Sequence, residues 1–245
     1  MATTIHEASW DYIQDMRGRI EPQLAAASTV AQAAQDFVDE LARSFSSIVL
    51  ARVFTVLPLR QLPAAERAWA ERFAVLASRA VPLDPSTPVL TLLGTSGAKP
   101  AWCKRETSIG HLAIPLVDAQ LVDGAPMIAE LLSSLQVDIH KRPGGGGGVE
   151  LRRLAGGRDG RFYVADAQSS LDARGRKIIA AEEFVAKHSI RTVFGMGGAY
   201  LGGEIVAAIV FTNETLTPTE ADRFPSLIGT FKLGTAKLAT THTWL

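Results

Sequence analysis

The single cysteine, Cys103, is one of few residues in this chain whose type could support chemistry. It lies in Ala-Trp-Cys-Lys-Arg, where the charges of Lys104 and Arg105 would favour a thiolate nucleophile. No pattern of histidine and acid surrounds it in the sequence, so we interpret it as an ordinary free thiol. One cysteine also excludes an internal disulfide, a Cys-rich zinc site and a dithiol redox couple within one chain.

The histidines show no spacing of the His-x-x-x-His kind, so we do not expect a metal site built from them. Five are present: His6, His111, His140, His188 and His242. His111 stands in Ser-Ile-Gly-His-Leu-Ala-Ile-Pro, among apolar neighbours. It could ligate a haem iron or donate to a ligand, and the alternative is a partly buried structural histidine.

Two glycine clusters invite comparison with nucleotide-binding motifs. Residues 94–99 lack the Gly-Lys-Ser/Thr of a phosphate-binding loop. Residues 195–200 have Tyr200 where a dinucleotide motif needs its third glycine, and they lead into a hairpin instead of a helix. We interpret both clusters as turns.

Two further features have a binding and a non-binding interpretation. Residues 140–161 are rich in Lys and Arg and would hold an anionic ligand or form a solvated basic loop. Asp166 ends an apolar segment and would either accept a hydrogen bond from a ligand or cap the following turn.

Composition describes a globular chain but no function. The 245 residues balance 25 Lys+Arg against 25 Asp+Glu, with 47% hydrophobic residues and a sequence pI near 7.0. Zero net charge gives no electrostatic footprint for nucleic acid, which we do not expect as a partner. No basic start followed by an apolar run and no membrane-length apolar stretch is present, so we expect a cytoplasmic protein with no membrane partner.

The first hundred residues alternate predicted helices and strands. Helical spacing predicts a short helix carrying Trp10 to Ile20 and an amphipathic helix over 24–45, and Pro22 should break or kink the path between them. Apolar and β-branched runs predict strands at 46–59 and 89–93, the second followed by a turn at 94–97. Between them, Pro63 opens a predicted helix over 63–79.

The remainder is irregular until a clear pattern near the end. We predict an edge strand at 107–116, a helix at 126–137, a flexible loop at 144–148, a strand at 162–167 and a helix at 180–188. Two apolar segments, 192–200 and 204–211, then flank Leu-Gly-Gly and predict a hairpin. Thr217-Pro218-Thr219-Glu220 predicts a capping-box helix start.

The order of these elements and several residues resemble a GAF domain, a small-molecule sensor module of signalling proteins. The resemblance spans about residues 30–238, and it is carried by Phe162 to Asp166, Ser189 to Phe194, Gly202 to Phe211 and Thr217 to Ala221. Phe194-Gly-Met-Gly-Gly resembles GAF-like regions ahead of kinase modules in bacterial sensor proteins. The chain has Met196-Gly-Gly where many GAF domains have Pro-Leu, and its segment 99–161 is longer than a plain GAF domain needs.

The resemblance implies an α+β fold: a central antiparallel sheet with helices on both faces and the N- and C-terminal helices packed together. We expect residues 1–23 to form an N-terminal helical extension and residues 24–245 a GAF-like sensor domain with an irregular insertion at about 99–161. The apolar stripes of the 24–45 and 219–240 helices predict a homodimer through these helices. In GAF proteins a cysteine can anchor a bilin, and GAF-type methionine sulfoxide reductases use more than one cysteine, so Cys103 alone does not support that enzyme.

The predicted function is regulatory: sensing a small organic ligand, without enzymatic activity and with no named cofactor. The alternatives are a GAF-like dimerisation module with no ligand and a small enzyme of unrecognised type. We expect the segment 99–161 to cover the sheet face that the terminal helices leave open. The predicted ligand-binding residues are Trp102, His111, Tyr163, Asp166, Phe194 and Met196.

Overall fold

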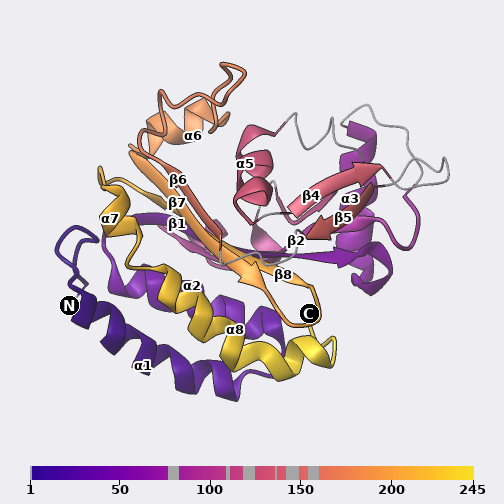
Figure 1. The fold of residues 1–245 in the computed structure, drawn as a ribbon, viewed down its shortest axis with the longest axis horizontal. Helices are drawn as coiled ribbons and strands as arrows, with labels where there is room; N and C mark the ends of the chain where they lie inside the picture. Colours follow the sequence, from indigo (N-terminus) through magenta and orange to yellow (C-terminus); the bar gives the residue numbers. More distant parts are fainter. Residues whose placement is uncertain are drawn as a thin grey trace.

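The computed structural model describes residues 2–76, 83–108, 111–117, 125–135, 137–141, 149–153 and 160–245. Its centre is an antiparallel sheet of six strands in the order β3-β2-β1-β8-β7-β6 (Figure 1). The strands are β1 (Ile48–Pro58), β2 (Pro88–Gly97), β3 (Ala113–Pro115), β6 (Gly160–Val164), β7 (Thr192–Ala199) and β8 (Ile205–Thr212). A separate hairpin pairs β4 (Val137–Lys141) with β5 (Val149–Arg153).

Helices cover both faces of this sheet (Figure 1). On one face lie α1 (Trp10–Ala26), α2 (Val30–Ser44), α7 (Pro218–Ala221) and α8 (Pro225–Thr240), and on the other lie α5 (Pro126–Ser134) and α6 (Glu182–Lys187), with α3 (Ala64–Leu76) near the β3 edge. Helices α2 and α8 contact the strands, and α1 packs across both helices. This confirms the predicted α+β class and the packing of the terminal helices.

The sheet separates two hydrophobic cores because side chains alternate along each strand. In β1, Ala51 and Val53 enter the core shared with α1, α2 and α8. Leu50 and Phe54 enter the core shared with α5 and α6. A strand that is buried on both faces needs apolar residues at nearly every position. This pattern in the sequence predicted β1.

The helix α1 does not break at Pro22, contrary to the prediction. It is continuous from Trp10 to Ala26, and α2 begins only at Val30 behind the capping Thr29. Pro22 is exposed, so the carbonyl group it leaves without a helical donor can bond to water. Ile20 and Leu24 remain buried on the opposite side and hold the helix in place.

Strand β2 continues through residues 94–97, where a turn was predicted. Opposite them, the pairing of β1 with β2 shifts between Val53 and Phe54. A Cβ atom built on Gly94 would lie 2.5 Å from the backbone carbon of Ala34. The glycine therefore lets α2 approach the sheet at van der Waals distance, and it serves packing instead of a turn.

The C-terminal pattern is largely as predicted. The β7–β8 hairpin forms with Gly203 at φ +95°, and Thr217 and Glu220 make the reciprocal capping box. The predicted single last helix is instead divided into α7 and α8, with Phe224 between them and Pro225 beginning α8. The divided path buries Phe224 against Phe45 and Phe194.

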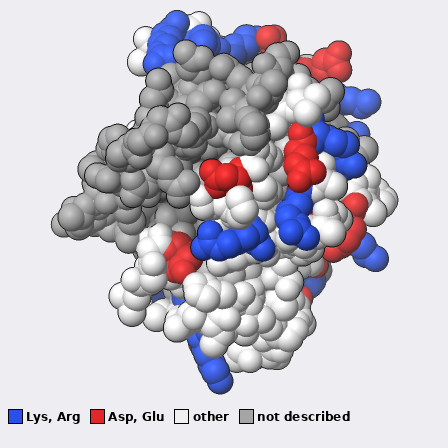
Figure 2. Space-filling model, turned by 90° about the vertical axis from the view of Figure 1, so that its right-hand side faces the viewer, with Lys and Arg blue, Asp and Glu red and all other residues white. Residues whose placement is uncertain are grey.

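The middle of the chain contains more regular structure than predicted. Helix α5 ends at Ser134, and the β4–β5 hairpin follows where we expected an irregular segment. The predicted loop 144–148 lies outside the described residues. On the face that carries α3, basic and acidic side chains are intermixed over the part that the structure describes (Figure 2).

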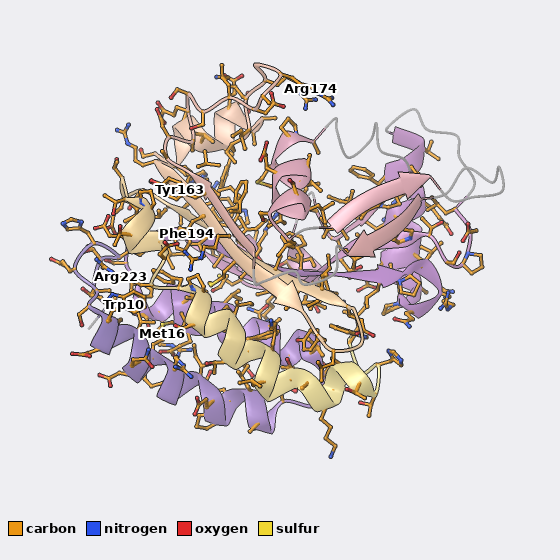
Figure 3. All side chains as sticks on the ribbon, in the orientation of Figure 1. Trp10, Met16, Tyr163, Arg174, Phe194 and Arg223 are labelled. Carbon is orange, nitrogen blue, oxygen red and sulfur yellow. The ribbon has the colours of Figure 1, made fainter. Side chains whose placement is uncertain are left out.

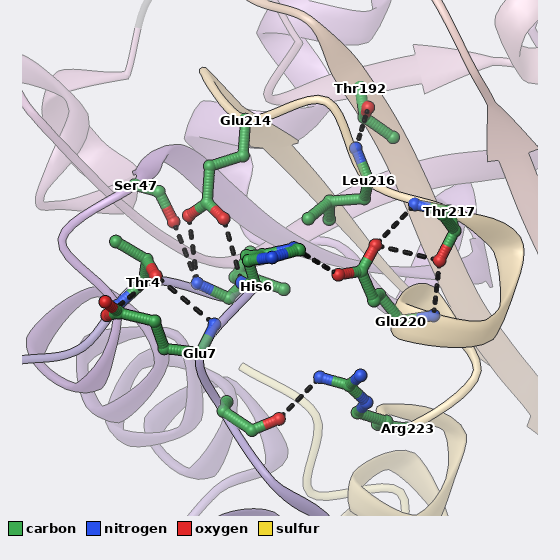
Figure 4. Close-up of polar contacts among 12 residues, drawn as sticks. Thr4, His6, Glu7, Ser47, Thr192, Glu214, Leu216, Thr217, Glu220 and Arg223 are labelled. Atoms are coloured by element: carbon green, nitrogen blue, oxygen red, sulfur yellow. Dashed lines mark hydrogen bonds and ion pairs between the residues drawn. The ribbon is translucent and has the colours of Figure 1, made fainter.

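The N-terminal segment is tied to the region around α7 (Figure 4). The backbone N–H groups of Ile5 and His6 donate to the two carboxylate oxygens of Glu214, at 2.9 and 2.8 Å. The His6 Nδ1 atom lies 2.5 Å from Glu220, the carboxylate that also completes the capping box. These hydrogen bonds and the ion pair therefore hold the residues before α1 against the helical layer that contains α7.

The close approach at Gly94 yields a stability prediction. Gly94→Ala should lower the free energy of unfolding by about 3 kcal/mol, because backbone atoms of α2 cannot yield as a side chain can. Gly229→Ala in α8 is the matched control: nothing lies within 4 Å of its added Cβ, so it should raise stability by about 0.5–1 kcal/mol. Urea unfolding measures both, and a Gly94→Ala cost no larger than 0.5 kcal/mol would contradict the packing described.

Candidate functional site

A cavity of about 390 Å³ lies on the sheet face opposite α2 and α8. Its floor is the sheet itself: Leu50, Arg52 and Phe54 of β1, Leu90 of β2, and Ile209 and Phe211 of β8. These residues share one face because they alternate with the residues that enter the helical core. The cavity is large enough for a small organic molecule and mostly apolar.

The walls come from the middle of the chain. The first turns of α5 contribute Pro126, Met127 and Leu131, and the segment entering α6 contributes Ile178 to Ala181 and Phe184. The end of α5 comes close to the sheet at Gly197: a Cβ atom there would lie 2.6 Å from Leu135 Cδ2 and 2.6 Å from the Val206 carbonyl oxygen. The glycine-rich sequence in β7, interpreted from sequence as a turn, is therefore strand that accommodates this contact.

Arg52 is the one permanent charge among the described residues that line the cavity. Only 8% of the residue is exposed, and burial lowers the pKa of its guanidinium to about 10. Its Nη2 donates to the Ser108 hydroxyl at 3.0 Å, while its buried Nε has no acceptor in the described part of the chain. A buried cation with an unused N–H group is costly for the fold and suited to an anionic oxygen.

His111, one of the residues predicted to bind a ligand, lines the cavity beside Arg52. His111 is exposed to solvent and also borders the cavity. The protein atoms packed around its imidazole, together with the positive charge of Arg52, lower the pKa of His111 to about 4. The imidazole is therefore neutral at pH 7 and can donate or accept one hydrogen bond.

Trp102 also lines the cavity. It belongs to the short 3-10 helix η2 (Pro100–Trp102), which follows β2; the described residues also include the 3-10 helices η1 (Leu59–Gln61) and η3 (Arg105–Thr107). The indole meets Phe184 edge-on at 5.6 Å between centroids, and the Lys99 ammonium lies 4.9 Å from its ring centre. The ring thus links the segment after β2 to α6. Of the predicted site residues, Trp102 and His111 are the pair that the cavity brings together.

Phe194, Met196 and Tyr163 lie on the other side of the sheet, which corrects the prediction that they form the pocket floor. Phe194 and Met196 share a face, as alternation required, but that face packs against the helical layer. Phe194 contacts Phe224, and the Tyr163 hydroxyl donates to the Leu216 carbonyl oxygen at 2.7 Å. Figure 3 labels Tyr163 and Phe194. Periodicity pairs side chains on one face without saying which layer covers it.

Asp166 is exposed and outside the cavity, so its predicted place among the pocket's polar groups is also corrected. Its carboxylate accepts from the Gln168 backbone N–H at 2.9 Å and the Ser169 hydroxyl at 2.5 Å. These hydrogen bonds lower its pKa. The residue caps the turn after β6, which is the alternative that the sequence left open.

Cys103 is half-buried next to Trp102 but does not line the cavity among the described residues. Its Sγ lies 3.3 Å from the carbonyl oxygens of Gly97 and Lys99. Within the described part of the chain, no group of three or more His, Cys, Asp or Glu side chains is placed to hold a metal ion. Of the basic segment 140–161, Arg161 forms an ion pair with Asp222 at 2.7 Å.

Arg52 was missed by the sequence analysis, although the sequence contained a signal. It is the only charged residue in the run Ile-Val-Leu-Ala-Arg-Val-Phe-Thr-Val of β1. Charged residues are almost never fully buried unless paired, so a lone arginine within a strand buried on both faces indicates a special environment. This signal can be interpreted only once both faces of the strand are known to be covered.

His111 yields a pH prediction. Its pKa is about 4 in the folded protein and near 6.5 when unfolded, so between these values the unfolded chain binds more protons. The contribution of the neutral His111 to the free energy of unfolding is therefore fully present above about pH 6.5. It is lost as the pH falls toward 4. His111→Asn should make the melting temperature fall less steeply from pH 7 to 5 than in the wild type. Identical slopes by calorimetry in both proteins would contradict this environment.

Comparison with known proteins gives similarity in structure alone. No family model and no curated protein matches the sequence. The GAF domain of a phosphoenolpyruvate-protein phosphotransferase from Coxiella burnetii matches with a TM-score of 0.51 at 9% identity, over 96% of this chain and 99% of that one. Free methionine-R-sulfoxide reductase from Neisseria meningitidis matches with a TM-score of 0.49 at 11% identity, over 98% of each chain.

A third similar structure is the phycoerythrobilin-bound GAF domain of a cyanobacterial phytochrome, with a TM-score of 0.46 at 9% identity over 94% of this chain and 97% of that one. At such identities a structural likeness concerns the fold and not the chemistry. The match at a TM-score of 0.51 covers the whole arrangement of an antiparallel six-stranded sheet with helices. The chain therefore has a GAF-like fold.

Proposed function

We propose that this chain is a regulatory domain that senses a small organic molecule bound in the cavity over β1 and β8. The observation that carries the proposal is the open space of about 390 Å³ between the sheet and α5–α6. The helical side of the same sheet is, by contrast, filled with fully buried side chains such as Phe37, Phe194 and Phe231. A mostly apolar cavity that lies directly on the sheet fits a binding function better than a structural one.

The proposal does not assign an enzymatic activity. In the described residues the hydrogen-bond partners of the Cys103 thiol are the backbone carbonyl oxygens of Gly97 and Lys99, which cannot act as a general base. The GAF-like fold itself is compatible with both regulation and catalysis, so this part rests on the site and not on the fold. A cytoplasmic location remains a prediction from the single cysteine.

The proposal predicts that filling the cavity abolishes binding. A mixed library of neutral, cationic and anionic compounds of drug-fragment size is screened by the thermal shift each causes. Ile209→Phe adds volume at the cavity floor, where Ile209 is 2% exposed, and it should remove the shifts seen with the wild type. Ile209→Leu conserves volume and is the matched control that should keep them.

Two results would reject the proposed site. One is a library in which no compound raises the melting temperature of the wild type. The other is a set of stabilising compounds that act equally on Ile209→Phe and the wild type, because their site would then lie elsewhere.

We propose in addition that two copies pair through the helical layer. Trp10 of α1 is 52% exposed and Leu233 of α8 is 80% exposed, so both helices of this layer present a large apolar side chain to solvent. Phe37 does not contribute, because it is fully buried against Phe231 within one chain. This is also the form that the alternative function, a dimerisation module without a ligand, would take.

Light scattering tests the pairing. The wild type should show the mass of a dimer at micromolar concentration, and Leu233→Glu should shift it to a monomer without loss of helical signal in circular dichroism. A wild type that is monomeric over the whole micromolar range would reject the pairing.

A further inference from the structure

The cavity combines an apolar lining with one buried cation that lacks a counter-charge. The described residues that line it include no Asp or Glu, and Arg52 is 92% buried at their centre. Buried arginines in folded proteins are normally paired with a carboxylate or saturated with hydrogen bonds. Here the Ser108 hydroxyl is the one acceptor that the structure gives to the guanidinium, and it carries no charge.

The neighbours of Arg52 on β1 show that packing alone does not require a charge at this position. Along the cavity face of β1 these neighbours are Leu50 and Phe54, and both are apolar and buried. An apolar residue at position 52 would continue that face without the cost of desolvating a charge. The N–H group of Nε has instead no acceptor among the residues that the structure describes.

We infer that the cavity binds an organic monoanion, an amphipathic carboxylic acid whose carboxylate pairs with Arg52 while its apolar body lies against Phe54, Ile209 and Met127. The inference rests on the proposed function and specifies the ligand class. The carboxylate supplies the missing charge and accepts from Nε. Ser108 holds the guanidinium in place, and the neutral His111 can donate one further hydrogen bond to the head group.

A single charge is favoured over a phosphate monoester. One guanidinium neutralises one negative charge, and a second buried charge would have no partner among the described lining residues. The volume of about 390 Å³ admits a head group with a chain or ring of modest size. The expected ligands are therefore medium-chain or arylalkyl carboxylic acids.

The first test needs no ligand. Arg52→Met removes a buried, uncompensated charge and conserves the apolar length of the side chain. If Arg52 serves binding, the variant should melt about 2–4 °C higher than the wild type, as substitutions that relieve functional strain do. Arg161→Met, which removes an exposed strand arginine, is the matched control and should change the melting temperature by less. A lower melting temperature for Arg52→Met would assign Arg52 a structural role and overturn the inference.

The second test compares acids with uncharged analogues by titration calorimetry at pH 7.5. The probes are octanoate with octanamide, 4-phenylbutanoate with 4-phenylbutanamide, and octyl phosphate. Each acid should bind the wild type at least about tenfold more tightly than its amide, the usual worth of a charge-assisted hydrogen bond. Octyl phosphate should bind more weakly than octanoate.

Arg52→Met should abolish the preference for acid over amide and leave amide affinity within a factor of about three. Arg52→Gln serves as a second variant in case the first folds poorly, and Arg161→Met should keep the preference. Equal binding of acid and amide to the wild type, tighter binding of octyl phosphate, retention of the preference in Arg52→Met, or no binding of any acid would each overturn the inference. A different result rejects the proposed function itself: no compound, charged or neutral, causes a thermal shift that Ile209→Phe removes.

Discussion

Strand β1 is buried on both of its faces, and the rest of the structure depends on this constraint. Ala51 and Val53 must face the helices, while Leu50, Arg52 and Phe54 must face α5 and α6. Shifting the register by one residue would exchange the two sets and place Arg52 among the apolar side chains of the helical core. The hydrophobic pattern of the strand therefore determines the register and, with it, the position of the buried cation.

The two faces of the sheet are covered in different ways, and this difference creates the cavity. On the helical face, α2 approaches closely at Gly94, α8 packs beside it, and α1 closes the layer from outside. The N-terminal segment is bonded to Glu214 and Glu220, which adds to that layer. On the opposite face, shorter segments around α5 and α6 leave space over β1 and β8. The well-packed layer of α1, α2 and α8 thus holds the sheet in place, and the opposite face of the sheet forms the floor of the cavity.

Local signals predicted the elements better than the site. The capping box at Thr217 and the β7–β8 hairpin were predicted because their signals lie within a few residues of each other. Phe194 and Met196 were correctly placed on one face, but which layer meets that face depends on the path of distant helices. Trp102 and His111 were expected near the pocket because the middle segment had to cover the open face, and they line it. Arg52 could not be recognised as a site residue before both sides of β1 were known to be covered.

Methyl NMR tests the central claim, that a small molecule binds between the sheet and α5–α6, most directly. Protein labelled at Leu and Ile methyl groups is titrated with the compound that raises the melting temperature most. The account predicts shifts concentrated at Leu50, Leu90 and Ile209 of the cavity floor, with Ile13, Ile20 and Ile228 of the helical layer changed little. Shifts confined to the helical layer, or no shifts at the cavity floor at saturation, would contradict it.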